Sequence, residues 1–366
     1  MAVEDNAVSF YPSNATVLSA SASADLACPE VPPVSDYFQG MGRELVWLLL
    51  ASGVSGLLSL LLFALQLYHI CAYVHDSLRR SRLAWLAASF PVVSMCSLAG
   101  VCFPRAMPVC DVFIALYIGR TLFSFLELLL SYLGGLLEAS KRLRGTPMRL
   151  DTLPICCLLT PCLQPLKASP QNLKRLWALV AQLGLLRPLV VLAKSILWTD
   201  QMNGGGSALS KRSRPVLQVV SVVSTVSAMW GLMILARLTR DLLPQLRLQA
   251  HIRLLQALIV ILSFQTGALG LLASDAVGLI PCSPLLPGES RASLWSHLAL
   301  VHEMLLLSLI GSLLLRPSRC AAFDLHPSRG PRSLEESRNV SAVTSVMDVS
   351  QLPNHTRSTA SIWPSA

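Results

Sequence analysis

Charged residues are scarce in this sequence. Only 13% of the 366 residues are Asp, Glu, Lys or Arg, whereas 53% are hydrophobic, and a soluble domain usually carries about 25% charged residues. Several uncharged runs exceed the roughly 20 residues that cross a bilayer as a helix. We therefore exclude a soluble domain and predict an all-α membrane protein. Its net charge of +9 is assigned to cytosolic loops that face anionic membrane lipid, and not to nucleic-acid binding.

Motifs of the common enzyme and receptor classes are missing as well. The chain contains no H-E-x-x-H, G-x-S-x-G or P-loop pattern, and its seven His residues are dispersed, which disfavours a zinc hydrolase. The third apolar run ends without the Asp/Glu-Arg-Tyr of rhodopsin-type receptors, and the last run has no Asn-Pro-x-x-Tyr. We therefore expect no enzyme, no cofactor and no bound metal, and we disfavour a receptor.

Seven apolar runs are predicted to cross the membrane as helices. They span residues 45–70, 83–103, 109–137, 176–198, 215–236, 254–274 and 296–315. Loops rich in Lys and Arg resist translocation. With the N-terminus extracellular and the C-terminus cytosolic, 20 of the 29 Lys and Arg residues lie on the cytosolic side, 6 lie outside and 3 lie within spans. We therefore predict a seven-helix transmembrane domain over residues 44–315 in this orientation.

Both ends of the chain are polar. Residues 1–43 carry five acidic residues against one Arg, and we predict an extracellular, extended tether that is glycosylated at the Asn14 sequon. Residues 316–366 are rich in Ser, Pro and Arg, which predicts a disordered cytosolic tail. The sequons of that tail, at Asn339 and Asn354, should stay unmodified because they face the cytosol.

The predicted cytosolic loop over residues 138–175 is basic and holds a cysteine cluster. Its cysteines are Cys156, Cys157 and Cys162. Cytosolic cysteines beside a span and near basic residues are typical S-palmitoylation acceptors, so we predict that lipidation anchors this loop at the inner leaflet. Free thiols are the alternative, and zinc fits less well because no His lies nearby. Two other cysteines, Cys28 and Cys282, fall outside on this topology and could form a disulfide.

Ionisable residues within the spans are costly to bury in lipid and are therefore candidate site residues. The candidates for substrate binding are Asp111, Arg120, Glu127, Arg187, Lys194 and Glu303. Arg120 and Glu127 are seven residues apart, and so are Arg187 and Lys194, which places each pair on one helix face. We expect Glu127 and Arg187 to lie near the same depth. The three cations would then form a net positive path that suits an amphipathic anion.

Structural alternatives stay open for these residues. Glu127 could pair with Arg187 or Arg120, and Lys194 could extend toward the lipid headgroups. Glu303 follows His302 directly. These two side chains could relay protons, but a hydrogen-bonded structural pair is the favoured interpretation.

A combination of motifs resembles a known family. Gly134-Gly135, then Thr146-Pro147-Met148, then the cysteine cluster is similar to the alpha subunit of the organic solute transporter. Further residues fall where that family places similar ones: Pro104-Arg105, Asp111, Lys194, Cys282-Ser283-Pro284, Arg291 and Glu303. The similarity covers roughly residues 40–320 and not the tails. One departure is that the family's inner acid of the third span would fall at Ser131, whereas here Glu127 lies one turn outward.

The resemblance implies a seven-helix transporter that works with a small single-span beta subunit. It implies sodium-independent facilitated transport of bile acids, conjugated steroids and related anions. The expected location is the basolateral plasma membrane of epithelia, after assembly in the endoplasmic reticulum. In this hypothesis Arg120, Arg187 and Lys194 attract the anion and Glu127 tunes their charge. The alternative is a seven-helix relative that acts in trafficking or scaffolding without solute transport.

Overall fold

Seven long helices form most of the described chain. The computed structural model describes residues 30–142, 147–148, 166–167, 169–202, 208–240, 248–274, 277–318, 320 and 322–325. The long helices are α3 (Arg43–Tyr73), α4 (Ser77–Cys102), α5 (Met107–Leu133), α7 (Pro170–Met202), α8 (Ala208–Arg240), α9 (Leu248–Leu272) and α10 (Gly288–Leu314). Each is long and apolar enough to cross a membrane. The predicted all-α membrane fold with seven spans is confirmed.

The ends of the helices differ from the ends of the predicted apolar spans. α7 begins at Pro170 and α8 at Ala208, both several residues before the predicted spans, because a helix continues through polar residues that lie beyond the apolar run. The third span is shorter than predicted. Gly134 and Gly135 adopt left-handed backbone, with φ of +77° and +89°, so α5 ends at Leu133. Glycine takes this conformation without a Cβ penalty, which is why it terminates helices so often.

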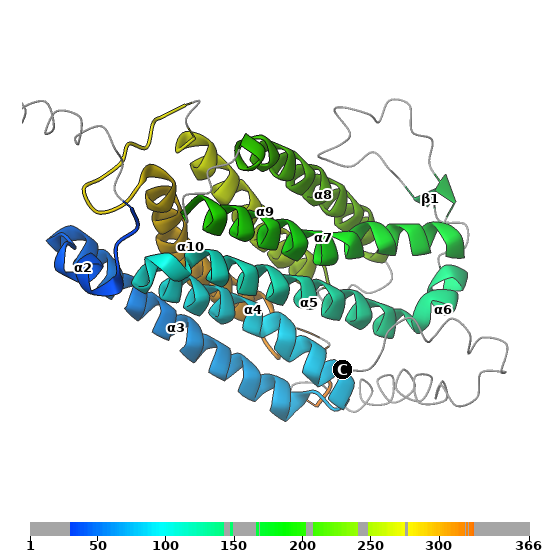
Figure 1. The fold of residues 1–366 in the computed structure, drawn as a ribbon. Coiled ribbons are helices and arrows are strands. Elements are labelled where there is room, and N and C mark those ends of the chain that lie inside the picture. The colour runs from blue at the N-terminus through cyan, green and yellow to red at the C-terminus, as the bar shows by residue number, and fades with distance from the viewer. Residues whose placement is uncertain are drawn as a thin grey trace, which may run out of the picture.

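Six of the long helices form a ring and the seventh lies outside it. Helices α4, α5, α7, α8, α9 and α10 are successive neighbours, and α10 closes the ring on α4. α3 packs on both α4 and α10 and lies at the edge of the bundle in Figure 1. Its exposed apolar side chains, such as Trp47, Val54 and Leu61, suit contact with lipid. α5 has the most buried span of the seven and therefore forms the centre of the packing.

Short elements mark the two ends of the bundle (Figure 1). At one end, which we call the α2 end, lie α2 (Val34–Gln39) and the 3-10 turn η1 (Pro104–Ala106). At the opposite end, the α6 end, lies α6 (Gly135–Arg142). Strands β1 (Pro147–Met148) and β2 (Leu166–Lys167) form an antiparallel pair beyond α6. This pair joins the two sides of the cysteine-bearing loop.

The predicted extended tether is wrong for the residues that form α2. Tyr37 is fully buried and clusters with Val101 of α4 and Met107 of α5. Arg105 donates two hydrogen bonds to the Val31 carbonyl oxygen, at 3.1 and 2.9 Å. Burial raises the pKa of Tyr37 to about 12. One aromatic anchor therefore folds this polar segment onto the bundle.

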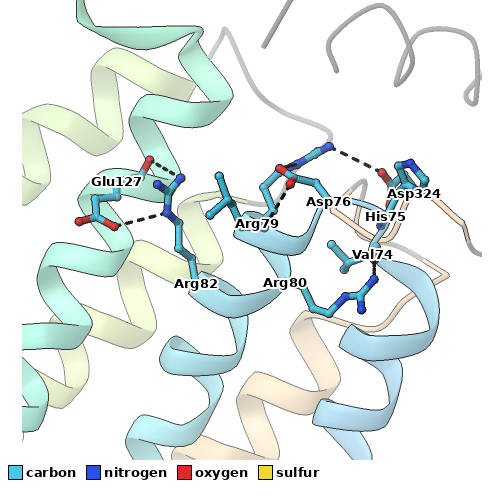
Figure 2. Close-up of polar contacts among 9 residues, drawn as sticks. Val74, His75, Asp76, Arg79, Arg80, Arg82, Glu127 and Asp324 are labelled. Atoms are coloured by element: carbon cyan, nitrogen blue, oxygen red, sulfur yellow. Dashed lines mark hydrogen bonds and ion pairs between the residues drawn. The ribbon is translucent and has the colours of Figure 1, made fainter. Parts of the chain in front are cut away.

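The predicted disordered tail is wrong for its first residues. The first described residues of the tail fold back across the α6 end. We call this segment the strap, and it comprises residues 316–318, 320 and 322–325. Cys320 is fully buried and Phe323 is 7% exposed. Asp324 accepts a hydrogen bond from the backbone N–H of His75 at 3.1 Å and lies 3.8 Å from the Arg79 guanidinium, as Figure 2 shows. The strap is thus held by burial and by charge to the turn between α3 and α4.

Candidate functional site

A polar cluster lies inside the ring, toward the α2 end. We call it the Asp111 cluster, and it comprises Asp111, Arg187, Lys194 and His297. The Asp111 carboxylate lies 3.6 Å from Nε2 of His297, whose side chain is 2% exposed, and it interacts electrostatically with both cations. Gly100 of α4 lies against the imidazole, since a Cβ there would lie 3.4 Å from the ring. Helices α5, α7 and α10 therefore bring one acid, two cations and one histidine together.

Each cation of the cluster is held by a neutral acceptor on a neighbouring helix. Nη1 of Arg187 donates to Oγ of Ser263 on α9 at 2.6 Å. Nζ of Lys194 donates to Oε1 of Gln218 on α8, also at 2.6 Å. Hydroxyl and amide oxygens orient a cation without cancelling its charge. With one carboxylate facing two permanent cations, the cluster keeps a net positive charge.

A close crossing of α5 and α7 positions this cluster. A Cβ at Gly119 would overlap the carbonyl oxygen of Gly184, and a Cβ at Gly184 would lie 2.9 Å from Phe123. Pro188 lies within α7 and has no N–H, so the Gly184 carbonyl four residues earlier lacks its helical donor and faces α5 instead. Small residues permit such approach between membrane helices. Arg187 follows one turn after Gly184 and is thereby placed next to α5.

A second charged group lies on the outer face of α4 and α5. Glu127 lies 3.4 Å from Arg82 and 3.6 Å from Arg120, and Figure 2 shows its contact with Arg82. The Arg120 guanidinium lies 5.8 Å from the ring centre of Trp85, within cation–π range. The side chains of Arg120 and Glu127 are 48% and 41% exposed. The pairing of Arg120 with Glu127, one of the two pairings that the sequence left open, is present.

The expected common path for all the charges is not what the structure has. Glu127 pairs with Arg82 and Arg120, whereas Arg187 lies in the separate Asp111 cluster. Helical phase explains the separation. Gly119 faces α7, so the next residue, Arg120, is turned away by about 100°, and Glu127 follows it two turns later. The sequence spacing was correct for each pair but could not show which face of α5 meets α7.

The favoured hydrogen bond between His302 and Glu303 is replaced by another contact. Nδ1 of His302 lies 2.8 Å from the carbonyl oxygen of Leu298 in the preceding turn of α10. Oε2 of Glu303 is buried, and within the described residues it has no hydrogen-bond partner. Adjacent helical residues point about 100° apart, which is why these two side chains do not bond directly.

A cavity of about 380 Å³ lies between α3, α4, α9 and α10 near the α6 end. We call it the α6-end cavity. Apolar side chains such as Leu65, Phe90 and Leu258 form most of its wall, and the strap contributes Arg316 and Phe323. The sequence reasoning missed this cavity because it searched the spans only for charges. Its available signal was a pair of polar residues, Gln66 and His69, three positions apart in an otherwise apolar span.

Several predicted sites involve residues that the structure does not describe. Asn14, Cys28 and the three loop cysteines lie outside the described residues. Cys282 is disulfide-bonded, whereas the other cysteines within the described ranges are free thiols. The pairing of Cys282 with Cys28 stays a prediction, as do glycosylation and lipidation. Across the described ranges, no group of three or more His, Cys, Asp or Glu side chains is placed to hold a metal ion.

Sequence comparison with known proteins relates the chain to one family. The family model described as organic solute transporter Ostalpha matches residues 48–318. Organic solute transporter alpha-like protein 3 of Caenorhabditis elegans is 27% identical, over 87% of this chain and 91% of its own length. The organic solute transporter subunit alpha of Danio rerio is 26% identical over 76% and 84% of the two chains. That of Leucoraja erinaceus is 27% identical over 78% and 80%.

No solved structure matches the chain. The family match covers α3 from residue 48 and the other six long helices in full. It therefore includes the Asp111 cluster and the part of the α6-end cavity that precedes residue 319. The chain belongs to the organic solute transporter Ostalpha family.

Proposed function

We propose that this chain is the alpha-type subunit of a heteromeric, sodium-independent facilitative transporter of amphipathic organic anions. Bile acids and conjugated steroids are the expected substrates, and a single-span beta-type subunit is the expected partner. The observation that carries the proposal is the net positive Asp111 cluster enclosed by the helix ring. Charge inside a membrane span is costly, so the charged residues found there usually serve binding or transport, and a positive excess suits an anion.

The roles of the charged residues follow their placement. Arg187 and Lys194 attract the anion, and the Asp111 carboxylate limits the excess positive charge when no anion is bound. Arg120 and Glu127 contribute from the outer face of α4 and α5, where they stabilise the packing of these helices. Glu303 of α10 is proposed to contribute to substrate binding as well. The expected location is the plasma membrane, basolateral in epithelia, after assembly in the endoplasmic reticulum.

Trafficking or scaffolding without transport is the competing function. The observation that favours it is that each cation already donates a hydrogen bond to a neutral side chain, Arg187 to Ser263 and Lys194 to Gln218, as it would in a purely structural network. In that case removal of a cation would lower the amount of folded protein and would not change a transport rate per molecule.

Uptake measurements separate the two functions. Cells would express the chain alone and together with a beta-type subunit, and uptake of a radiolabelled bile acid and of a steroid sulfate would be measured with and without sodium. We expect uptake only when both chains are present, at the same rate without sodium. An absence of uptake by protein that is confirmed at the cell surface would reject the transporter.

The cluster itself is tested by removing one charge. Arg187→Gln should lower uptake of both anions by about ten-fold, because a charge-assisted contact contributes about 1.5–3 kcal/mol. Arg187→Lys should retain part of the activity. The matched control is Arg253→Gln on the exposed face of α9, which should leave uptake unchanged. Equal loss of uptake and of surface protein in Arg187→Gln would indicate the structural role instead.

A further inference from the structure

We propose that the α6-end cavity holds the apolar body of the transported amphipathic anion, and that Arg316 of the strap contacts its anionic group. This inference rests on the proposed function and adds the place where the solute is bound. It concerns a site separate from the Asp111 cluster, at the other end of the ring and against α3, the one long helix that lies outside it.

The size and lining of the cavity fit a compact apolar molecule. Its volume of about 380 Å³ lies within the roughly 300–1,000 Å³ of typical small-molecule sites. Leucines of α3, α4 and α9, including Leu65, Leu86 and Leu258, line it together with the rings of Phe90 and Phe323. Such a wall removes apolar surface from water on several sides and binds a rigid hydrocarbon without hydrogen bonds.

Polar side chains also line the cavity, among them Gln66, His69, Ser89, Thr121, His251 and Ser312. Gln66 of α3 donates to Oγ of Ser312 on α10 at 2.5 Å and so links two walls. The His69 ring stacks on Tyr73 with ring centres 6.1 Å apart. Arg316 follows the end of α10 and is exposed, and its side chain has no hydrogen bond or ion pair within the described residues. A cation that is free to bind therefore stands at the rim of an apolar cavity.

This arrangement matches the two parts of an amphipathic anion. The apolar body is removed from water in the cavity, while the anionic group stays at the rim, where a guanidinium binds sulfate or carboxylate with two parallel hydrogen bonds. The Asp111 cluster lies further along α9 than the cavity. Leu258 lines the cavity, and Ser263, which holds Arg187, follows after about 7.5 Å of helix rise. An anion leaving the cavity inward thus meets the net positive cluster next.

Gly311 offers a way to fill the cavity without disturbing the helices. It lines the cavity, and a Cβ there would lie 3.6 Å from Leu254 and Phe90, which are ordinary contacts. Gly311→Leu would project the rest of its side chain into the empty volume. The matched control is Gly270→Leu on the exposed side of α9, where a Cβ would meet no atom within 4 Å. Both changes replace glycine by a better helix former.

The test measures binding directly. The full chain with its beta-type subunit would be placed in nanodiscs of phosphatidylcholine, and binding of tritiated oestrone sulfate would be measured by scintillation proximity, with unlabelled oestrone as a neutral competitor. We expect Gly311→Leu to raise the Kd for oestrone sulfate by about ten-fold or more and Gly270→Leu to leave it unchanged. A Kd in Gly311→Leu equal to that of the wild type would overturn the proposal.

Arg316 is tested by the difference between a charged and a neutral steroid. Arg316→Gln should raise the Kd for oestrone sulfate by about ten-fold and leave competition by oestrone unchanged, while Arg316→Lys should restore much of the affinity. An equal weakening of both steroids would reject Arg316 as the contact for the anionic group.

The remaining measurements distinguish a failure of the proposed binding cavity from a failure of the proposed transport function. Wild-type protein that binds no oestrone sulfate would reject the ligand class. Uptake of oestrone sulfate by Gly311→Leu at the wild-type rate would reject the cavity while leaving the transport function intact. Binding that depends on Gly311, without uptake by the wild type, would support the cavity and reject transport. Addition of phosphatidylserine to the nanodiscs tests a lipid occupant, and its displacement of oestrone sulfate would assign the cavity to lipid.

Discussion

Single residues without side chains set the geometry of the charged cluster. Gly119 and Gly184 let α5 and α7 touch through their backbones, and Pro188 directs the Gly184 carbonyl to that contact. Arg187 is adjacent to Pro188 in the chain, so its position depends on the same local break in the hydrogen-bond ladder. The charge arrangement is thus built on positions that carry no charge.

The crossing at Gly119 gives a prediction about stability. Gly119→Ala would place a methyl group on the Gly184 carbonyl, which belongs to rigid backbone, and overpacking of this kind costs about 1–3 kcal/mol. We expect a Tm several degrees lower in detergent, measured by the loss of the monodisperse peak on size-exclusion chromatography after heating.

The control for that change is Gly270→Ala. Nothing lies within 4 Å of a Cβ at Gly270, and alanine is about 1 kcal/mol better than glycine in a helix, so its Tm should be equal or higher. A Gly119→Ala protein as stable as the Gly270→Ala protein would show that α5 and α7 can separate without cost.

At the scale of elements, hydropathy was sufficient for the long helices and insufficient for the segments that cap them. Each span carries its own apolar surface, so it can be recognised from its own residues. α2 and the strap are polar on average, and they are ordered by a few contacts with distant parts of the chain. Tyr37 packs against α4 and α5, and Asp324 contacts residues near the start of α4. Such contacts leave no local pattern in the sequence.

The strap gives a prediction at this scale. Asp324→Ala would remove its contacts with Arg79 and with the His75 N–H, and hydrogen bonds to a charged group contribute about 1.5–3 kcal/mol. Opening of the strap should therefore become about ten-fold or more frequent. Cys320 reports this directly because its thiol is buried and is not part of a disulfide, and its reaction with N-ethylmaleimide, followed by peptide mass spectrometry, should accelerate accordingly.

Cys71 serves as the internal control for the strap experiment. It is an exposed free thiol on α3, and its labelling rate should be the same in both proteins. An unchanged rate at Cys320 would mean that burial of Phe323 and its neighbours holds the strap without help from the ion pair.

At the scale of the whole molecule, the packing of the helices builds the Asp111 cluster and the α6-end cavity from residues that are distant in the sequence. Spacing predicted that Arg187 and Lys194 share a face of one helix, and the structure gives that face partners on α5, α8 and α9. The α6-end cavity combines residues from α3 to the strap, which lie up to 261 positions apart between Leu62 and Phe323. Which helices become neighbours is decided by packing between them, and periodicity within one helix carries no record of it.

The orientation of the ring decides which side of the membrane the cavity meets. The distribution of Lys and Arg predicts an extracellular α2 end and a cytosolic α6 end, so the cavity would open near the cytosol and the Asp111 cluster would lie nearer the outside. Glycosylation reports the orientation of the chain in the membrane, because only sequons on the lumenal side are modified. We expect a glycan at Asn14 and none at Asn339 or Asn354.

The measurement is the shift in electrophoretic mobility after treatment with peptide N-glycosidase F. The shift should be present in the wild type, absent in Asn14→Gln and retained when Asn339 and Asn354 are both changed to Gln. A shift that disappears only in the double variant would place the C-terminus outside. The cavity would then take its solute from the extracellular side, and the Asp111 cluster would be the last site before the cytosol.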